Sequence, residues 1–196
     1  IAVVHYYGSW FSGGEFLPDN CSKTIIDAIN FIYQKRGAKT FDNKELKWDF
    51  DFLNLIGYSF GALNVARSNP NYYKVNSVFL FSPMLYVNKK DIGKYLSRDK
   101  SIDHIGFNKF FMKFLQRGYF NNYRGITNNK WNDFFNGNYT EKTRKQTNNE
   151  LNYYIFHGDQ DTTIPVESSK YFCRINKKAK LFILKGLDND TKEKIN

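Results

Sequence analysis

The stretch "FLNLIGYSFGAL", residues 52 to 63, contains the pattern G-x-S-x-G centred on Ser59. The apolar residues before the pattern predict a buried strand over residues 51–58, and those after it predict a helix over residues 62–67. A serine on a tight strand-to-helix turn presents its hydroxyl beyond the carboxyl end of the strand, where open parallel sheets bind ligands. Ser59 is therefore a candidate nucleophile, and the alternative is an ordinary turn with a capping serine.

Two glycines, Gly57 and Gly61, flank this serine. Because glycine has no Cβ, we expect both to let the strand and the helix approach without a steric clash. A strained turn with an outward-facing hydroxyl requires that close approach.

Strands and helices alternate along the rest of the chain. Further strands are predicted over residues 1–7, 75–81, 150–156 and 179–184, and further helices over residues 19–37 and 168–175. This alternation predicts an α/β fold, with a mostly parallel sheet and helices on both faces. Residues 88–150, rich in Asn, Lys and aromatic side chains, interrupt it as an insertion with helical stretches near 107–116 and 129–136.

A second group of polar residues lies in "YIFHGDQDTTIP", residues 154 to 165. A predicted strand ends near His157, and the loop after it, called the acid loop below, carries Asp159 and Asp161. An acid in a loop after a later strand is suited to orient an imidazole and to stabilise its charged form. Alternatively, both aspartates cap the turn and the helix that follows.

Together these motifs resemble the α/β-hydrolase superfamily, in the same order along nearly the whole chain. Residues 157–165 look like that family's H-G-x-x-D-x-x-[VI]-P segment, whose second aspartate is the acid of the catalytic triad. The match selects Asp161 over Asp159. "FLFSPML", residues 79 to 85, follows in the family's order, and "YYGSWFSGGEF", residues 6 to 16, resembles the loop after the family's fourth strand.

The resemblance implies that residues 1–7 are the fourth strand and that the family's first three strands lie outside this chain. A rival interpretation makes "VVHYYGS", residues 3 to 9, the third strand with its oxyanion loop, but only one predicted helix separates it from the serine strand. In the family an earlier loop supplies one oxyanion donor, and the backbone N–H of Phe60 is expected to supply the other.

In the family the catalytic histidine follows the last core strand, commonly in a Gly-x-x-His-like turn. Here that turn reads Gly-Leu-Asp-Asn over residues 186–189, so Asn189 occupies the position expected for histidine. An amide has no group that accepts a proton near neutral pH, and Asn189 therefore cannot take the proton of the serine. Three explanations stay open: an engineered inactivating substitution, a natural pseudoenzyme, or a base beyond residue 196.

The histidines of the chain are poor substitutes for this base. His157 ends the strand before the acid loop, where the family often has a structural histidine, and His5 lies in the first predicted strand. His104 lies in the insertion beside Asp103 and is an alternative base only if the insertion brings it to the mouth of the site. A lone histidine is usually structural or exposed.

Residues 88–150 fall where the family usually has a cap or lid over the site. We therefore expect an α/β-hydrolase core of residues 1–87 and 151–196, with residues 88–150 as the cap. The aromatic side chains of the insertion suit an apolar acyl-binding roof. The helical spacing from Phe107 to Phe114 favours, for most of them, a role in packing a small subdomain onto the core.

The composition argues against several other classes. The net charge of +10 comes from 29 Lys and Arg against 19 Asp and Glu, but these residues are scattered, which favours a solvated surface over a nucleic-acid interface. Cys21 and Cys173 have no disulfide or metal-ligand spacing and are predicted to be small buried thiols. Neither a signal peptide nor an apolar membrane span is found in the sequence, so we expect a cytoplasmic protein. We also expect no cofactor and no metal.

These expectations combine into a serine hydrolase that cleaves a carboxylic ester, a thioester or a short peptide bond through an acyl-enzyme. Its activity is expected to be absent or strongly impaired because Asn189 replaces the base. The expected partner is a small-molecule acyl substrate, and the oligomeric state does not follow from the sequence. The alternative is a non-catalytic binding protein on the same scaffold, in which Ser59 is retained but idle.

Overall fold

The computed structural model describes residues 1–40, 42–70, 74–85, 124–125, 130–131, 150–161 and 164–188. The helices are α1 (Pro18–Lys35), α2 (Phe60–Ser68) and α7 (Val166–Ile175), and the strands are β1 (Gly37–Lys39), β2 (Glu45–Lys47), β3 (Asn54–Tyr58), β4 (Ser77–Phe81), β5 (Asn152–Gly158) and β6 (Ala179–Leu184). From β3 onward, strands and helices alternate as predicted, apart from the insertion. Of that insertion, only residues 124–125, 130–131 and 150 are described, so its proposed role as a cap lies largely outside the described residues.

The main sheet has four parallel strands in the order β3-β4-β5-β6. Its register pairs Leu55 with Val78, and Leu80 with Ile155. Strands that are neighbours in space thus follow one another in the chain. Each connection returns the chain to the amino-terminal end of the sheet before the next strand begins. The predicted α/β class and its parallel sheet are confirmed.

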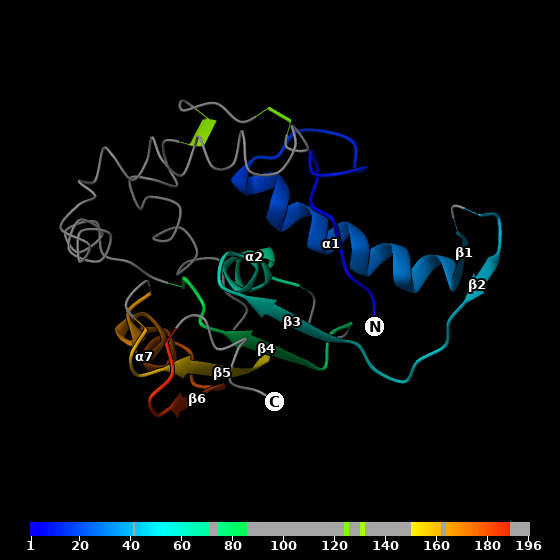
Figure 1. Ribbon diagram of the computed structural model, residues 1–196. Helices are drawn as coiled ribbons and strands as arrows, with labels where there is room; N and C mark the ends of the chain where they lie inside the picture. The colour runs from blue at the N-terminus through cyan, green and yellow to red at the C-terminus, as the bar shows by residue number, and fades with distance from the viewer. Residues whose placement is uncertain are drawn as a thin grey trace.

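The hydrophobic core lies between one face of this sheet and the helices (Figure 1). Alternate side chains of the central strands, among them Leu80 of β4 and Tyr153 of β5, point into it and are fully buried. Helix α2 packs on β3 and β4, α7 packs on β5 and β6, and α1 packs on α2. The period of two along each strand therefore places one set of side chains under all three helices.

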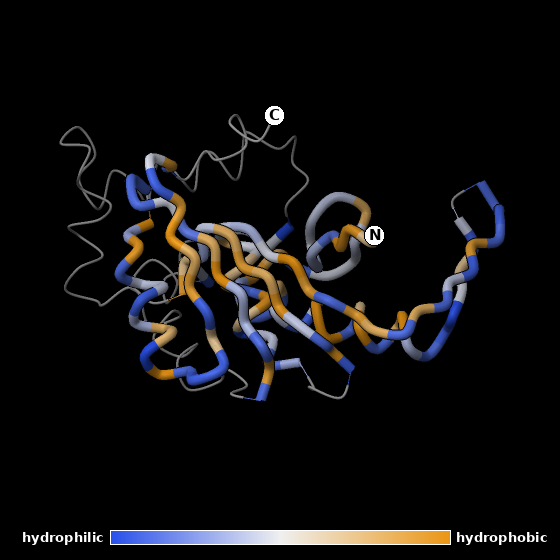
Figure 2. The backbone as a smooth tube through the Cα atoms, turned by 90° about the horizontal axis from the view of Figure 1, so that it is seen from below, coloured by the Kyte–Doolittle hydropathy of each residue, from blue (hydrophilic) through white to orange (hydrophobic). Residues whose placement is uncertain are grey.

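The opposite face of the sheet carries a ladder of stacked aromatic rings. Ring centroids lie 5.2 Å apart for Phe79 and Tyr154, 5.0 Å for Phe81 and Phe156, and 4.9 Å for Phe156 and Phe182. Figure 2 views the sheet from this side, with the strands in front. No described helix covers this face, and Ile56 is 71% exposed. The sequence predicted helices on this second face as well, and that part of the prediction lies outside the described residues.

Helix α1 begins and ends for local reasons. Pro18 occupies its first turn, where the missing N–H costs no hydrogen bond, and Ile25 and Ile29, four residues apart, are buried against the core. The helix was predicted to run to Gly37, but its carboxyl end is Arg36, in the left-handed region at φ 52°. Gly37 instead begins the antiparallel pair β1–β2, which was not predicted.

The strand predicted over residues 1–7 is wrong. The first six residues have no regular structure, and Val3 is 84% exposed. A strand needs a neighbour to satisfy its backbone, and within the described residues β3 pairs only with β4. The segment is instead tied to α1: the Tyr7 N–H donates to Thr24 Oγ1 at 3.0 Å, and the Tyr7 hydroxyl donates to Asp27 at 2.6 Å.

The two cysteines have free thiols. Cys21 is buried in α1, and burial, with a smaller contribution from Asp19, raises the pKa of its thiol; Cys173 is half-buried in α7. In the described part of the chain, no group of three or more His, Cys, Asp or Glu side chains is placed to hold a metal ion. Nor does any helix in those residues have the length and apolar character needed to cross a bilayer.

Candidate active site

Ser59 lies on a strained turn between β3 and α2. Its backbone angles are φ 50° and ψ −117°, a conformation that L-residues rarely adopt. The Ser59 N–H donates to the Phe81 carbonyl at 2.9 Å, which holds the turn against the end of β4. The side chain makes no capping hydrogen bond to α2. The geometry thus matches a serine held outward on a sharp elbow and not a helix-capping serine.

The two glycines of the motif differ in what they do. A Cβ at Gly57 would lie 2.6 Å from the Cα of Ala62 and 2.9 Å from its nitrogen, so only glycine lets β3 and α2 approach this closely. A Cβ at Gly61 would meet only the Tyr6 hydroxyl, at 3.5 Å, which is an ordinary contact. The expectation of a steric role is confirmed for Gly57 and wrong for Gly61, because Gly61 faces a side chain and not the strand.

The carboxyl ends of the strands lie in one row. Backbone hydrogen bonds continue past the strand ends, from Ser59 N to the Phe81 carbonyl and from Ser82 N to the Phe156 carbonyl, both at 2.9 Å. The row continues with Asp159 N, which donates to Leu184 O at 3.1 Å. The Ser59 turn, the loop that carries Asp159 and Asp161, and the turn after β6 therefore occupy the same edge of the sheet, with β4 between the first two.

Asp161 is buried in the loop after β5. Its side chain has no exposed area, and its Oδ1 accepts a hydrogen bond from Ile164 N at 2.7 Å. This bond is the turn-capping contact that the sequence left open as an alternative, so Asp161 stabilises its loop whatever else it does. Asp159 lies on the exposed side of the loop, where its Oδ1 accepts from Gly186 N at 2.7 Å.

His157 holds the acid loop from inside and is fully buried. Its Nε2 lies 2.8 Å from the Ile164 carbonyl and 3.2 Å from Asp161 Oδ2, while its Nδ1 lies 2.8 Å from the Ser169 hydroxyl. Both groups beside Nε2 are acceptors, so that nitrogen is a donor toward them. With both ring nitrogens engaged in this way, His157 has the structural role that the sequence suggested.

The position expected for the base, Asn189, lies outside the described residues, as does His104. The chain is described up to Asp188, directly before it. Gln160 N donates to Leu187 O at 3.0 Å, and a Cβ at Gly158 would lie 2.0 Å from that same oxygen. The turn that leads to position 189 therefore packs directly on the acid loop.

An aromatic cluster that sequence reasoning missed lies beside the elbow. Trp131 is buried, and its ring centroid is 5.3 Å from that of Phe16 and 6.0 Å from that of Phe60. The Trp131 indole N–H donates to the Phe16 carbonyl at 3.1 Å. Tyr6 packs edge-on against Phe60 with centroids 6.1 Å apart. The aromatic density of "GSWFSGGEF" was the available signal, but it did not identify the partner in the insertion.

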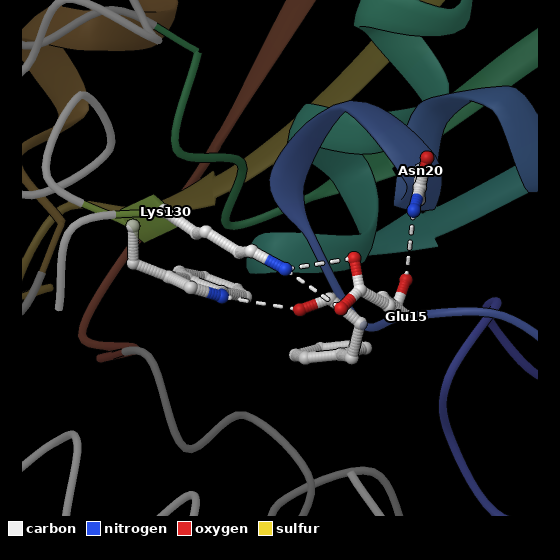
Figure 3. A network of polar contacts seen from close by, with 5 residues as sticks. Glu15, Asn20 and Lys130 are labelled. Atoms are coloured by element: carbon white, nitrogen blue, oxygen red, sulfur yellow. Dashed lines mark hydrogen bonds and ion pairs between the residues drawn. The ribbon is translucent and has the colours of Figure 1, made fainter. Parts of the chain in front are cut away.

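An ion pair lies next to this cluster (Figure 3). Lys130 Nζ is 2.7 Å and 2.9 Å from the two carboxylate oxygens of Glu15, and the Asn20 side-chain amide donates to the Glu15 carbonyl at 2.9 Å. Both charged side chains are partly exposed, so the pair contributes little to stability. It joins residue 130 of the insertion to the loop after residue 8.

We expect Trp131→Phe to lower the free energy of unfolding by about 1 kcal/mol, because the buried Phe16 carbonyl loses its donor while most of the ring packing remains. Urea denaturation measures this change. The matched control is Trp10→Phe: Trp10 is 44% exposed, and we expect a change within about 0.5 kcal/mol. Equal effects of the two substitutions would contradict a specific role for the indole N–H.

Comparison with known proteins identifies the fold but no close relative. No family model matches the sequence, and no curated protein matches it. Similar solved structures include a monoacylglycerol lipase of Paleococcus ferrophilus (16% identity, TM-score 0.55, 96% of this chain and 77% of that one). An esterase of Pyrococcus furiosus is also similar (17% identity, TM-score 0.56, 92% of this chain and 59% of that one). So is mouse alpha/beta hydrolase domain-containing protein 10 (14% identity, TM-score 0.52, 96% of this chain and 69% of that one).

At these identities the likeness concerns the fold, and the chain spans 59% to 77% of the length of the three structures. The parallel order β3-β4-β5-β6 agrees with that likeness, as does the strained serine turn after β3. The loop that carries Asp161 follows β5 and precedes α7, in agreement with the predicted order of elements. The chain therefore has the α/β-hydrolase fold.

Proposed function

We propose that this chain carries the site of a serine hydrolase that cleaves a carboxylic ester, a thioester or a short peptide bond, and that Asn189 strongly impairs its turnover. The observation that carries the proposal is the backbone of Ser59, held at φ 50° and ψ −117° between β3 and α2. Such strain persists only where the surrounding structure enforces it, and it clusters at active sites. A serine that only ended a turn would need neither these angles nor the contact at Gly57.

In the proposed reaction, Ser59 Oγ attacks the acyl carbon and forms a new C–O bond. The carbonyl oxygen becomes an oxyanion, which the backbone N–H of Phe60 stabilises from the amino-terminal end of α2. The intermediate collapses by breaking the bond to the leaving alcohol, thiol or amine, and leaves an acyl-enzyme. Water then cleaves the acyl-enzyme and restores the serine.

Each of these steps needs a base that takes a proton from Ser59 or water and returns one to the leaving group. Asp161, buried at the same edge of the sheet, would orient a histidine at position 189 and stabilise its charged form. The turn over residues 186–188 packs on the acid loop, which supports this pairing. The amide of Asn189 does not exchange protons in this way, so acylation is expected to be slow.

The proposed substrate is a small molecule with an apolar acyl group. Tyr6, Phe16, Phe60 and Trp131 form an aromatic cluster next to the elbow, which supports an apolar surface near Ser59. Trp131 brings part of the insertion to this place, in keeping with a cap formed by residues 88–150. The similar structures include a monoacylglycerol lipase and esterases, which fits acyl ester chemistry.

A fluorophosphonate probe tests the assignment of the nucleophile, because it modifies only an activated serine. We expect slow labelling of the chain as it stands and labelling faster by about a hundredfold or more in Asn189→His. Peptide mass mapping is expected to locate the modification on Ser59. Fast labelling of the unaltered chain would contradict the role assigned to Asn189.

Two serine variants control that experiment. Ser59→Ala is expected to abolish labelling in both backgrounds. Ser68→Ala, at the far end of α2, removes a hydroxyl bonded to the Val65 carbonyl and is expected to leave labelling unchanged. Modification of any other serine in Asn189→His would remove Ser59 from the site.

The alternative function is a non-catalytic binding protein on this scaffold, favoured specifically by the amide at position 189. It predicts that Asn189→His is labelled no faster than the unaltered chain, while acyl ligands still bind. Calorimetry with a slowly hydrolysed acyl ester analogue, read beside the labelling rates, separates the two functions.

A further inference from the structure

We propose that Asp159 is a positioning residue: its carboxylate fixes the turn over residues 185–188, the segment that leads to position 189, against the acid loop. This inference rests on the proposed function for its catalytic consequence. The tie between the two loops is a separate claim that is measurable without any turnover.

Asp159 makes two hydrogen bonds here, one to the end of β6 and one to the turn that follows it. Its Oδ1 accepts from Gly186 N at 2.7 Å, and its own N–H donates to Leu184 O at 3.1 Å. Leu184 is the last residue of β6, so Asp159 spans the turn from the strand end to its second residue. A charged acceptor at 2.7 Å is a strong contact for a backbone N–H.

Gly186 makes this contact through its conformation. Its φ is +71°, in the left-handed region, and a Cβ there would meet nothing within 4 Å. Glycine is therefore placed here for its backbone angle and not for lack of room. The left-handed angle sets the direction of the amide that donates to the carboxylate, and the chain then runs through Leu187 and Asp188 to position 189.

The next residues reinforce the same arrangement. Gln160 N donates to Leu187 O at 3.0 Å, and Gly158 lies so close to that carbonyl that a Cβ would be 2.0 Å from its oxygen. On the inner side of the loop, His157 contacts both Asp161 and the Ile164 carbonyl. The acid loop is thus held from within by His157, and the turn is held onto it from outside by Asp159.

Asp159 itself is exposed, so its removal is expected to loosen the turn without unfolding the core. Asparagine keeps an acceptor oxygen in the same place and removes the charge, whereas alanine removes the acceptor. The pair Asp159→Asn and Asp159→Ala therefore separates the hydrogen bond from the charge. Asp42→Ala, an exposed aspartate in the β1–β2 loop, is the matched control.

The first readout is hydrogen exchange of the Gly186 amide, followed by NMR on the otherwise unaltered chain. We expect exchange faster by about tenfold in Asp159→Ala, a rate close to the original in Asp159→Asn, and no change in Asp42→Ala. The melting temperature is expected to stay the same in all three. An unchanged Gly186 exchange rate in Asp159→Ala would overturn the proposal.

The second readout is ester hydrolysis in the Asn189→His background. Asp159→Ala is expected to lower kcat by about tenfold with little change in KM, and Asp159→Asn is expected to restore most of it. Equal losses with both substitutions would overturn the positioning role, because charge and not the hydrogen bond would then matter. If the Asn189→His background itself shows no hydrolysis, the proposed function fails, and Gly186 exchange still decides whether Asp159 ties the two loops.

Discussion

Asn189→His is expected to raise kcat for short acyl esters by about a thousandfold or more over the unaltered chain. The reason is the proton: a histidine beside Asp161 accepts it from Ser59 and returns it to the leaving group, whereas an amide does neither. The measurement is steady-state hydrolysis of p-nitrophenyl acetate and butyrate, with both proteins at equal concentration.

Asp161→Asn is the decisive control for this gain. In the Asn189→His background it keeps the size of the side chain but removes the charge that orients the imidazole, and we expect it to cancel most of the increase. In the unaltered chain the same substitution is expected to have little effect on the rate, because there is no imidazole to orient. If the unaltered chain already hydrolyses these esters and Asn189→His gains nothing, the base lies elsewhere, and His104→Ala then tests the histidine in the insertion.

Gly57→Ala is expected to lower the free energy of unfolding by about 3 kcal/mol. The added Cβ would lie 2.6 Å from the Cα of Ala62, 2.9 Å from its nitrogen and 3.0 Å from the Gly61 carbonyl. All three are backbone atoms, so no side-chain rotation relieves the contact, and β3 must separate from α2. Equilibrium urea denaturation followed by circular dichroism measures the loss.

The second glycine of the motif provides the comparison. Gly61→Ala places a Cβ in ordinary contact with Tyr6, inside a helix where alanine is favoured over glycine by up to about 1 kcal/mol, so we expect equal or higher stability. Gly13→Ala, where a Cβ meets nothing within 4 Å, is expected to be neutral. A loss at Gly61 as large as that at Gly57 would contradict the distinction between them.

Much of the sheet was predictable because its strands are short apolar runs bounded by turn residues. The strand predicted over residues 179–184 has the observed limits. Strands β3 and β4 end as predicted but begin three and two residues later, and β5 is displaced by two residues. Helix α2 begins at Phe60 and not at Ala62, because the elbow leads directly into the helix. These local patterns carry enough information to give the α/β class.

The errors arise where the outcome depends on residues far away in the chain. Residues 1–7 read as a strand from composition, but a strand also needs a partner, and none pairs with them in the described structure. Periodicity could not predict which face of the sheet the helices cover, because strands that are apolar at nearly every position give the same pattern on both faces. The hairpin β1–β2 has three-residue, mostly exposed strands with no apolar pattern to reveal it.

In the candidate site, too, some features follow from local sequence and others depend on residues far away in the chain. The places of Ser59 and Asp161 at the carboxyl edge of the sheet were predictable from motif and element order, whereas their catalytic roles stay predictions. The contact of Asp159 with Gly186 joins residues 27 apart, and that of Trp131 with Phe16 joins residues 115 apart. Such contacts are set by the folded sheet, and a single sequence carries no direct signal for them.

The backbone of Ser59 also bears on how stability is distributed in this molecule. An L-residue held in so sparsely populated a region costs roughly 1–3 kcal/mol, a sizeable part of the 5–15 kcal/mol by which a domain is typically stable. A glycine would hold the same angles without that cost. The Ser59 turn therefore lowers the stability of the fold below what a glycine at the same position would give. A search for thermostable variants that ignored the chemistry would favour replacing Ser59, and with it the hydroxyl on which the proposed reaction depends.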